Sequence, residues 1–360
     1  MSAHIYQPTF PSQLRSIRFA SMFSVRSLAR TMSSLTPGHV LQGACWNYSF
    51  KELIKGDHMH NSDVFRAQVV PREISRIDSK APEWALIKKA SNFGHATVNL
   101  QREVNIYGLP DVASAKCFRK MYEKVDDSTI ALEWLDTTLA EVTYRPDMRT
   151  YSIIKAVLKT AFTSCVILED YKYVNTDYKP ANILLSNIDT DNVIAKVGDS
   201  GLVVPVGELL HAQPYAMRAT EVFLGEPCTG PSQVWAVAAM LLCWIKPGLL
   251  GAWGSPLYLI NEAWSMAKIL RLFPYWKIPT LELVKCDTHQ ALVDSARSVS
   301  KEVPALQKIE PFDKETKKVV PQQLRDLLRF ILVPDPTQRP TASSVLASKE
   351  FRDFERYVSV

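Results

Sequence analysis

The middle of the chain carries Val174-Asn-Thr-Asp-Tyr-Lys-Pro-Ala-Asn-Ile-Leu-Leu185, followed by Gly198-Asp-Ser-Gly201. Together the two stretches hold two carboxylates, an ammonium group and an amide: Asp177, Lys179, Asn182 and Asp199. Asp199 comes seventeen positions after Asn182. A polar loop could match either pattern by chance, but both patterns in this order and at this spacing indicate one functional site.

These four groups suit the transfer of a phosphoryl group to a hydroxyl. The reaction needs a carboxylate at the hydroxyl proton, which we assign to Asp177, and a cation beside the moving phosphoryl group, which we assign to Lys179. The leaving charge needs Mg²⁺, and the oxygens of Asn182 and Asp199 are suitable ligands for that ion. We therefore predict catalytic residues Asp177 and Lys179 and metal ligands Asn182 and Asp199.

The hydrophobic pattern changes along the chain. Short apolar runs early in the chain each suit a strand: 64–70, 84–88 and 128–133. Helical periodicity appears once in this part, at 100–107, and dominates from Met148 onward, with expected helices at 151–170, 232–245, 260–272 and 321–332. The pattern predicts an α+β protein, with a small sheet and one helix followed by a larger helical part.

Two further segments point to a family. Gln213-Pro-Tyr-Ala-Met-Arg-Ala-Thr-Glu-Val-Phe-Leu-Gly225 is similar to the end of a protein-kinase activation loop, and Leu332-Val-Pro-Asp-Pro-Thr-Gln-Arg-Pro-Thr341 is similar to a terminal kinase motif. From about residue 50 to 354 the chain resembles eukaryotic Ser/Thr protein kinases. The T-D-x-K-P form of the loop and the small residue after Asp199 point to the SR-protein-kinase-like group common in fungi.

The resemblance implies a bilobal protein-kinase fold. Its parts would be an N-terminal extension over 1–46, a small β-rich N-lobe with one main helix over 47–135, and a larger helical C-lobe over 136–356. A hinge near 133–136 would join the lobes, with the active site in the cleft between them. Glu221 and Arg339 match a buried ion pair of that fold, and a bidentate pair of this kind would hold the substrate-binding segment against the C-lobe.

The resemblance also implies a site for ATP and Mg²⁺. Lys88 would grip the α- and β-phosphates and Glu103 would fix that lysine, while Lys89 is a rival for the same role. Backbone groups of Glu133 and Leu135 would meet the adenine edge. The predicted nucleotide-binding residues are Lys88, Glu103, Gly56, Val64, Leu86, Glu133, Leu135 and Leu184.

The nucleotide pocket departs from the kinase pattern at two places. The loop that should cover the phosphates reads Gly56-Asp-His-Met-His-Asn-Ser-Asp-Val64, with one glycine where the pattern has three. Because glycine lets the backbone approach phosphate closely, the nucleotide should be held more weakly. Leu86 stands where an alanine normally stacks on adenine, and its bulk should narrow the pocket.

Three further positions carry small or polar side chains in place of the usual ones. Asn175, Ser200 and Gln233 stand where kinases have His, Phe and Asp, and we expect all three to be buried. Buried polar groups must find partners or cost about 1–3 kcal/mol each. We therefore expect the active geometry to be loosely held.

These residues leave three functions open. An active Ser/Thr protein kinase is favoured because all six ionic and amide groups are present, and its partner would be a protein substrate, with an Arg/Ser-rich one as the candidate. A pseudokinase that acts as a binding or scaffold module is the alternative raised by the glycine-poor loop. A small-molecule phosphotransferase shares the D-x-x-x-x-N pattern but lacks the A-x-E and D-P-x-x-R-P segments. We expect a monomer that binds neither nucleic acid nor membrane.

The composition is that of a globular intracellular protein. The 360 residues are 47% hydrophobic, and the six cysteines are scattered without a C-x-x-C pair, which favours a reduced compartment. Residues 1–50 carry four arginines and no acid. This Ser-rich head is either a mitochondrial transit peptide or a flexible extension, so cytoplasm, nucleus and mitochondrion stay open. The apolar run 234–245 is shorter than the roughly 20 residues of a membrane span.

The segment after Gly201 lacks the residues that are phosphorylated in many kinases. Many kinases order the activation segment by placing a phosphate on a Ser or Thr within it, where arginines pair with the phosphate. Between Gly201 and Tyr215 this chain has no Ser or Thr. We therefore expect any activity to be constitutive.

Overall fold

The structure is a computed structural model, and it describes residues 38–55, 62–72, 81–91, 94–208, 213–278 and 287–359. Most of the predicted N-terminal extension lies outside these residues, as do Gly56 and the rest of the glycine-poor loop up to Asn61. The described residues belong to a single unit of the chain. The predicted α+β class is confirmed.

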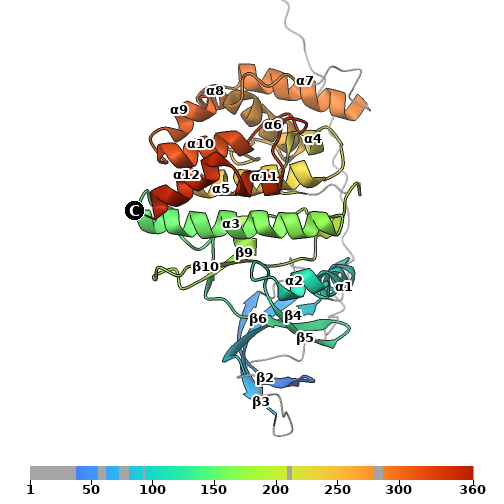
Figure 1. The fold of residues 1–360 in the computed structure, drawn as a ribbon. Helices are drawn as coiled ribbons and strands as arrows, with labels where there is room; N and C mark the ends of the chain where they lie inside the picture. Colours follow the sequence, from blue (N-terminus) through green and yellow to red (C-terminus); the bar gives the residue numbers. More distant parts are fainter. Residues whose placement is uncertain are drawn as a thin grey trace, which may run out of the picture. The chain divides into compact units, whose positions relative to one another are not determined.

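The first part of the described chain is an antiparallel sheet of six strands, drawn in blue to green in Figure 1. Alternating burial explains these strands: on β3, Phe65 and Ala67 are buried, whereas Val64 and Arg66 are only partly covered. In spatial order the strands are β1 (Val40–Gln42), β2 (Trp46–Lys55), β3 (Ser62–Pro71), β4 (Trp84–Ala90), β6 (Thr129–Glu133) and β5 (Met121–Asp126). The sequence predicted β3, β4 and β6 and missed the other three.

The sheet curls until its two edges meet. Glu123 lies on the edge strand β5, yet its carboxylate accepts hydrogen bonds from Ala44 N at 2.5 Å and from the Tyr48 hydroxyl at 2.6 Å, both near the opposite edge. Gly43 lies against the same carboxylate, and a Cβ there would clash with it. The curl is therefore fixed by one buried acid and one glycine that are 80 positions apart in the chain.

One main helix accompanies the sheet. Helix α1 (Ala96–Tyr107) packs near β4 and β5, with the short α2 (Pro110–Ser114) after it. Its buried residues follow helical spacing and include Leu100, Glu103 and Tyr107. A carboxylate thus lies on the packed face of this helix, directed into the protein.

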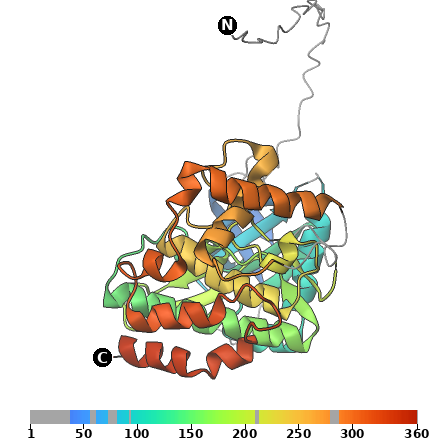
Figure 2. The same ribbon diagram turned by 90° about the horizontal axis from the view of Figure 1, so that it is seen from above.

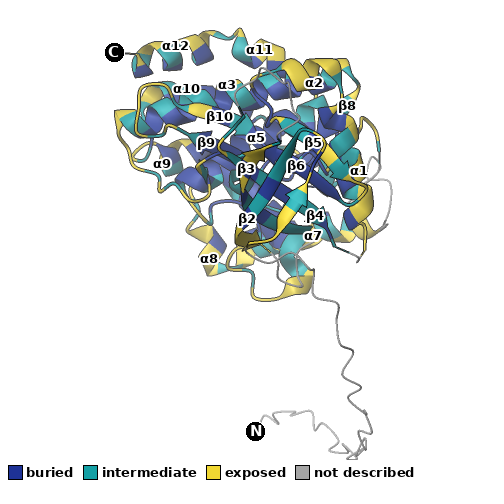
Figure 3. Ribbon diagram, turned by 90° about the horizontal axis from the view of Figure 1, so that it is seen from below, coloured by how far each residue is buried: buried dark blue, intermediate teal, exposed yellow. Residues whose placement is uncertain are grey.

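The second part is helical and is built around α3 (Met148–Asp170) and α5 (Gly230–Ile245). Nearly every residue of α5 is buried, as the dark blue helix in Figure 3 shows. Figure 2 shows α12 in red beside α10 and the green α3. The other helices are α4 (Thr220–Phe223), α6 (Asn261–Leu272), α7 (Asp287–Glu302), α8 (Pro304–Gln307), α9 (Phe312–Thr316), α10 (Gln322–Ile331), α11 (Ala342–Leu346) and α12 (Lys349–Val358).

The expected helices are present, with small shifts at their ends. Helix α3 begins three residues before the expected start, because the side chain of Asp147 accepts a hydrogen bond from Thr150 N at 2.8 Å and caps it. At 23 residues α3 is long and apolar enough to cross a membrane by length and composition, a property that the sequence reading overlooked. It packs against α5, α11 and α12, so its apolar character matches a core helix.

Candidate functional site

Paired antiparallel strands bring together the loop that holds Asp177 and the loop that holds Asp199. Strand β8 (Tyr173–Asn175) pairs with β11 (Val203–Pro205), and β9 (Ile183–Ser186) pairs with β10 (Ile194–Val197) and with the short β7 (Thr137–Thr138). The loop from β8 to β9 therefore lies beside the loop from β10 to β11. Gly198 N donates to Asn182 O at 2.9 Å and Thr176 N to Leu202 O at 3.2 Å, which ties the two loops together at both ends.

Asp177 is held in one orientation by its own loop. One carboxylate oxygen, Oδ2, accepts hydrogen bonds from Lys179 Nζ at 2.7 Å and from Asn182 Nδ2 at 2.9 Å. The backbone N–H of Asp177 donates to Asn175 Oδ1 at 2.9 Å. Burial raises the pKa of Asp177, while the neighbouring Lys179 ammonium acts to lower it. Asp177 as a whole is 7% exposed, and its Oδ1 has no hydrogen-bond partner among the described residues.

Lys88 on strand β4 contacts both helix α1 and the loop that holds Asp199. Its Nζ lies 2.7 Å from Glu103 Oε2 and 3.1 Å from Asp199 Oδ1. Burial acts to lower the pKa of Lys88, but the two carboxylates outweigh it and the pKa is raised. Lys89 points to the other face of β4 because side chains alternate along a strand. Of the two rival lysines, Lys88 is the one that the structure brings to the predicted site.

A cavity of about 660 Å³ connects these groups, within the size range of small-molecule sites. Its lining includes ten of the predicted site residues: Val64, Leu86, Lys88, Glu103, Leu135, Asp177, Lys179, Asn182, Leu184 and Asp199. Gly56 lies outside the described residues. The backbone N–H and C=O of Leu135 have no hydrogen-bond partner in the described part of the chain, so they remain available to a ligand.

Glu133 is the predicted residue that does not line the cavity. Its carboxylate pairs with Lys196 Nζ at 2.7 Å, and its carbonyl oxygen accepts from Arg119 Nε at 2.7 Å. Its N–H donates to Lys120 O at 2.8 Å. The carbonyl oxygen of Glu133 has a second lone pair, so it can accept a hydrogen bond from adenine while it still accepts one from Arg119.

The side chains of Asp199 and Asn182 offer oxygens that fit a magnesium ion. Asp199 has a φ of 53°, which is uncommon for a residue other than glycine, and its side chain is 44% exposed. Burial acts to raise the pKa of Asp199, but Lys88 outweighs it and holds the pKa below its usual value, so the group is a carboxylate. Asn182 donates to Asp177 through Nδ2, and its Oδ1 has no hydrogen-bond partner in the described part of the chain.

No cluster of three His, Cys, Asp or Glu side chains in the described residues could hold a metal. Mg²⁺ commonly binds proteins through one or two carboxylates together with phosphate oxygens and water. Asn182 and Asp199 fit an ion of that kind, brought to the site with a phosphate.

The three unusual polar residues have different surroundings. Asn175 N donates to Gln233 Oε1 at 3.3 Å, and Gln233 Nε2 donates to Glu169 Oε1 at 3.0 Å. Gln233 thus anchors the loop of Asp177 to helices α5 and α3. Ser200 differs, because its buried hydroxyl has no hydrogen-bond partner among the described residues. Asn175 and Gln233 therefore have the partners that buried polar groups need, and the expectation of a loosely held geometry stays a prediction.

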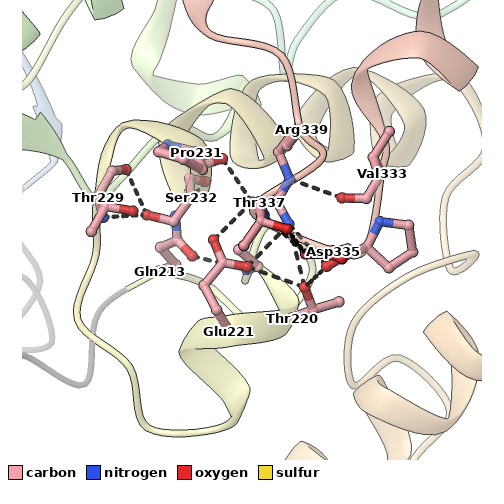
Figure 4. A network of polar contacts seen from close by, with 12 residues as sticks. Gln213, Thr220, Glu221, Thr229, Pro231, Ser232, Val333, Asp335, Thr337 and Arg339 are labelled. Carbon is pink, nitrogen blue, oxygen red and sulfur yellow. Dashed lines mark hydrogen bonds and ion pairs between the residues drawn. The ribbon is translucent and has the colours of Figure 1, made fainter. Parts of the chain in front are cut away.

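The predicted pair of Glu221 and Arg339 is formed and buried, as Figure 4 shows. Arg339 Nη1 and Nη2 donate to the two oxygens of Glu221 at 2.7 and 3.0 Å. The guanidinium also donates to the carbonyl oxygens of Val333 and Pro231. The segment that precedes Glu221 is fixed by Gln213, a residue that the sequence analysis did not single out. The side chain of Gln213 donates a hydrogen bond to Ser232 O and accepts one from Ala219 N.

A second residue that the sequence reading missed is Arg119. It is 8% exposed and lines the cavity between α1 and β6. The signal available in the sequence was a single arginine after the apolar pair Cys117-Phe118, a pattern too common to indicate a site.

No model of a known protein family matches this chain, and a comparison with curated proteins found no match.

Proposed function

We propose that this protein is an ATP-dependent Ser/Thr protein kinase with the bilobal kinase fold. The curled sheet and α1 would be the N-lobe, the helical part the C-lobe, and residues 133–136 the hinge. The observation that supports this most is the convergence of Lys88, Glu103, Asp177, Lys179, Asn182 and Asp199 on one cavity. Kinase chemistry requires these six groups in these roles.

Asp177 would act on the substrate hydroxyl. With Oδ2 held by Lys179 and Asn182, Oδ1 can accept a hydrogen bond from the hydroxyl, orient its oxygen and take its proton. The raised pKa of Asp177 makes the carboxylate a better proton acceptor. Lys179 lies next to this oxygen, where its ammonium would stabilise the charge of the moving phosphoryl group.

The remaining groups would hold the nucleotide. Lys88 would donate to the phosphates while Glu103 and Asp199 hold its ammonium in place. Asn182 and Asp199 would ligate Mg²⁺, which when bound neutralises charge on the phosphates. Leu86, Leu135 and Leu184 would cover the adenine ring with apolar surface.

A pseudokinase is the second candidate. It is favoured by the single glycine in 56–64 and by the unpaired Ser200 hydroxyl beside Asp199. Nucleotide binding without phosphate transfer would distinguish it from an active kinase.

The test is the transfer of radiolabelled phosphate from ATP to an Arg/Ser-repeat peptide, by the wild type and by Asp177→Asn. We expect Asp177→Asn to lower turnover at least about 100-fold, because the hydroxyl loses its oriented acceptor. Asp191→Asn is the matched control, since it removes an exposed carboxylate from a nearby turn, and it should transfer phosphate like the wild type. Equal, slow transfer by wild type and Asp177→Asn would reject the enzyme and favour the scaffold.

A further inference from the structure

Glu103 is a fully buried carboxylate with an incomplete set of partners. Its side chain is 0% exposed, Oε2 accepts from Lys88, and Oε1 has no hydrogen-bond partner in the described part of the chain. Burial raises the pKa of Glu103. A buried charge is costly unless other charges compensate it. A second cation near Glu103 would therefore matter to its ionisation and position.

Arg119 is that cation. It lies before β5, lines the same cavity as Glu103, and interacts electrostatically with Glu103 and Asp199. Its Nε donates to Glu133 O at 2.7 Å, which fixes the guanidinium between β6 and α1. Burial lowers the pKa of Arg119, but an arginine keeps its charge across the physiological range. The charged groups around Glu103 are thus Lys88 from β4, Arg119 from the segment before β5, and Asp199 from the second loop.

The net charge of the groups around Arg119 indicates its role. With both carboxylates ionised, Lys88, Glu103 and Asp199 together carry one net negative charge, in the region where a triphosphate would bind. The guanidinium of Arg119 would balance that charge. Without Arg119, Glu103 would have Lys88 as its one cationic neighbour among the described residues, and Lys88 would be shared by Glu103, Asp199 and the incoming phosphates.

We propose that Arg119 is a positioning residue of the nucleotide site: through Glu103, it keeps Lys88 available to the phosphates. The inference rests on the proposed function, because it takes ATP as the ligand. It concerns phosphate binding and not phosphate transfer.

The test compares two ligands by calorimetric titration, Mg·ATP and adenosine, which lacks phosphates. Arg119→Met removes the charge and keeps an unbranched side chain. We expect it to weaken Mg·ATP binding about 10-fold or more, the scale of losing one partner of a buried charge cluster, and to change adenosine binding less than about 3-fold. Arg119→Lys keeps the charge and should restore most of the Mg·ATP affinity.

Two further variants separate the role of Arg119 from damage to the fold. Lys120→Met removes an exposed cation one position away and should bind both ligands like the wild type. In a Glu103→Gln background, Arg119→Met should weaken Mg·ATP binding little further, because Arg119 is proposed to act through the charge of Glu103.

Several outcomes would overturn the inference. Equal weakening of Mg·ATP and adenosine would make Arg119 a residue of the hinge or the fold, and unchanged Mg·ATP affinity would remove any role. Additive losses in the Glu103→Gln background would exclude Glu103 as its route. A wild type that binds Mg·ATP but transfers no phosphate would refute the kinase and leave this test intact, whereas one that binds neither ligand would refute both.

Discussion

At the scale of single residues, a hydrogen-bond partner decides whether a buried polar group supports the site. Gln233 and Ser200 are both fully buried, and both stand where kinases have a different residue. Gln233 bridges Asn175 and Glu169, so it replaces a charged anchor with a neutral one. The buried Ser200 hydroxyl lies near the hydroxyl of Tyr107, but neither group has a hydrogen bond of normal geometry among the described residues, so little offsets their desolvation cost.

Substitutions at these two positions should change stability in opposite directions. Gln233→Ala leaves Asn175 N without its acceptor and should lower the free energy of unfolding by about 2 kcal/mol. Ser200→Ala removes an unpaired hydroxyl and should raise that free energy by about 1 kcal/mol. Urea unfolding followed by circular dichroism measures both. A loss of stability in Ser200→Ala would show that the hydroxyl has a partner, such as a bound water.

At the scale of elements, the loop between α5 and α6 is held by a buried lysine. Lys268 on α6 is 3% exposed, and its Nζ donates to the carbonyl oxygens of Gly248 and Trp253, both at 2.7 Å. No carboxylate among the described residues pairs with it. Burial lowers the pKa of Lys268 to about 8, from 10.5 for a free lysine. The neutral amine keeps two N–H donors, enough for both carbonyls.

This lysine should make stability depend on alkaline pH. Between about pH 8 and 10.5 the unfolded chain keeps a proton that the native Lys268 has lost, so the free energy of unfolding rises with pH. Relative to Lys268→Met, the wild type should gain on the order of 1–2 kcal/mol over this window, and nothing between pH 6 and 7. Urea unfolding of both proteins at each pH measures the difference, in which other titrating groups cancel. A difference that stays constant with pH would contradict the assignment.

The elements also show which features local sequence can predict. Helices α3, α5, α6 and α10 were predictable because their apolar spacing is local. The curl of the sheet was not, because it depends on Glu123 reaching residues 44–48 across the whole sheet. Strand β5 was missed for a related reason: its pattern of exposed and half-buried residues makes sense only beside β6.

At the scale of the whole molecule, the site residues that could be predicted lie close together in the sequence, whereas those that were missed depend on contacts between distant segments. The residues of the two loops lie within 23 positions, and paired strands bring the loops together, so spacing alone placed Asp177, Asn182 and Asp199. Backbone groups of Glu133 were predicted to meet the adenine edge, but Glu133 does not line the cavity and its carbonyl oxygen accepts a hydrogen bond from Arg119. Arg119 acquires a role only from neighbours on α1 and β6 that no local pattern reveals.

The segment after Gly201 is held to the rest of the molecule by contacts that need no modification. Strand β11 pairs with β8, and Val203 and Val204 are fully buried. Arg102 on α1 donates to Gly201 O at 2.9 Å. Phosphorylation orders such a segment in many kinases by giving arginines a new anionic partner. Here protein groups already bind the start of the segment.

The end of the segment has its arginine engaged as well. Arg218 pairs with Glu262 of α6, donates twice to Gln213 O, and lies 4.7 Å from the centre of the Tyr215 ring. Residues 209–212 lie outside the described residues, and their sequence, Leu-Leu-His-Ala, contains no hydroxyl. Tyr215 is thus the one hydroxyl between Gly201 and Arg218, and its ring is packed against a cation that already has a carboxylate partner.

We therefore predict that any phosphate transfer by this protein is constitutive. Treatment with a phosphatase, followed by its removal, should leave the rate of peptide phosphorylation unchanged, and Tyr215→Phe should transfer at the wild-type rate because the ring contact with Arg218 remains. Glu262→Gln serves as the comparison: it weakens the existing ionic contact of Arg218, so it should lower the rate where phosphatase does not. Mass spectrometry that finds a phosphate between residues 201 and 218, with loss of turnover on its removal, would show that the segment is switched after all.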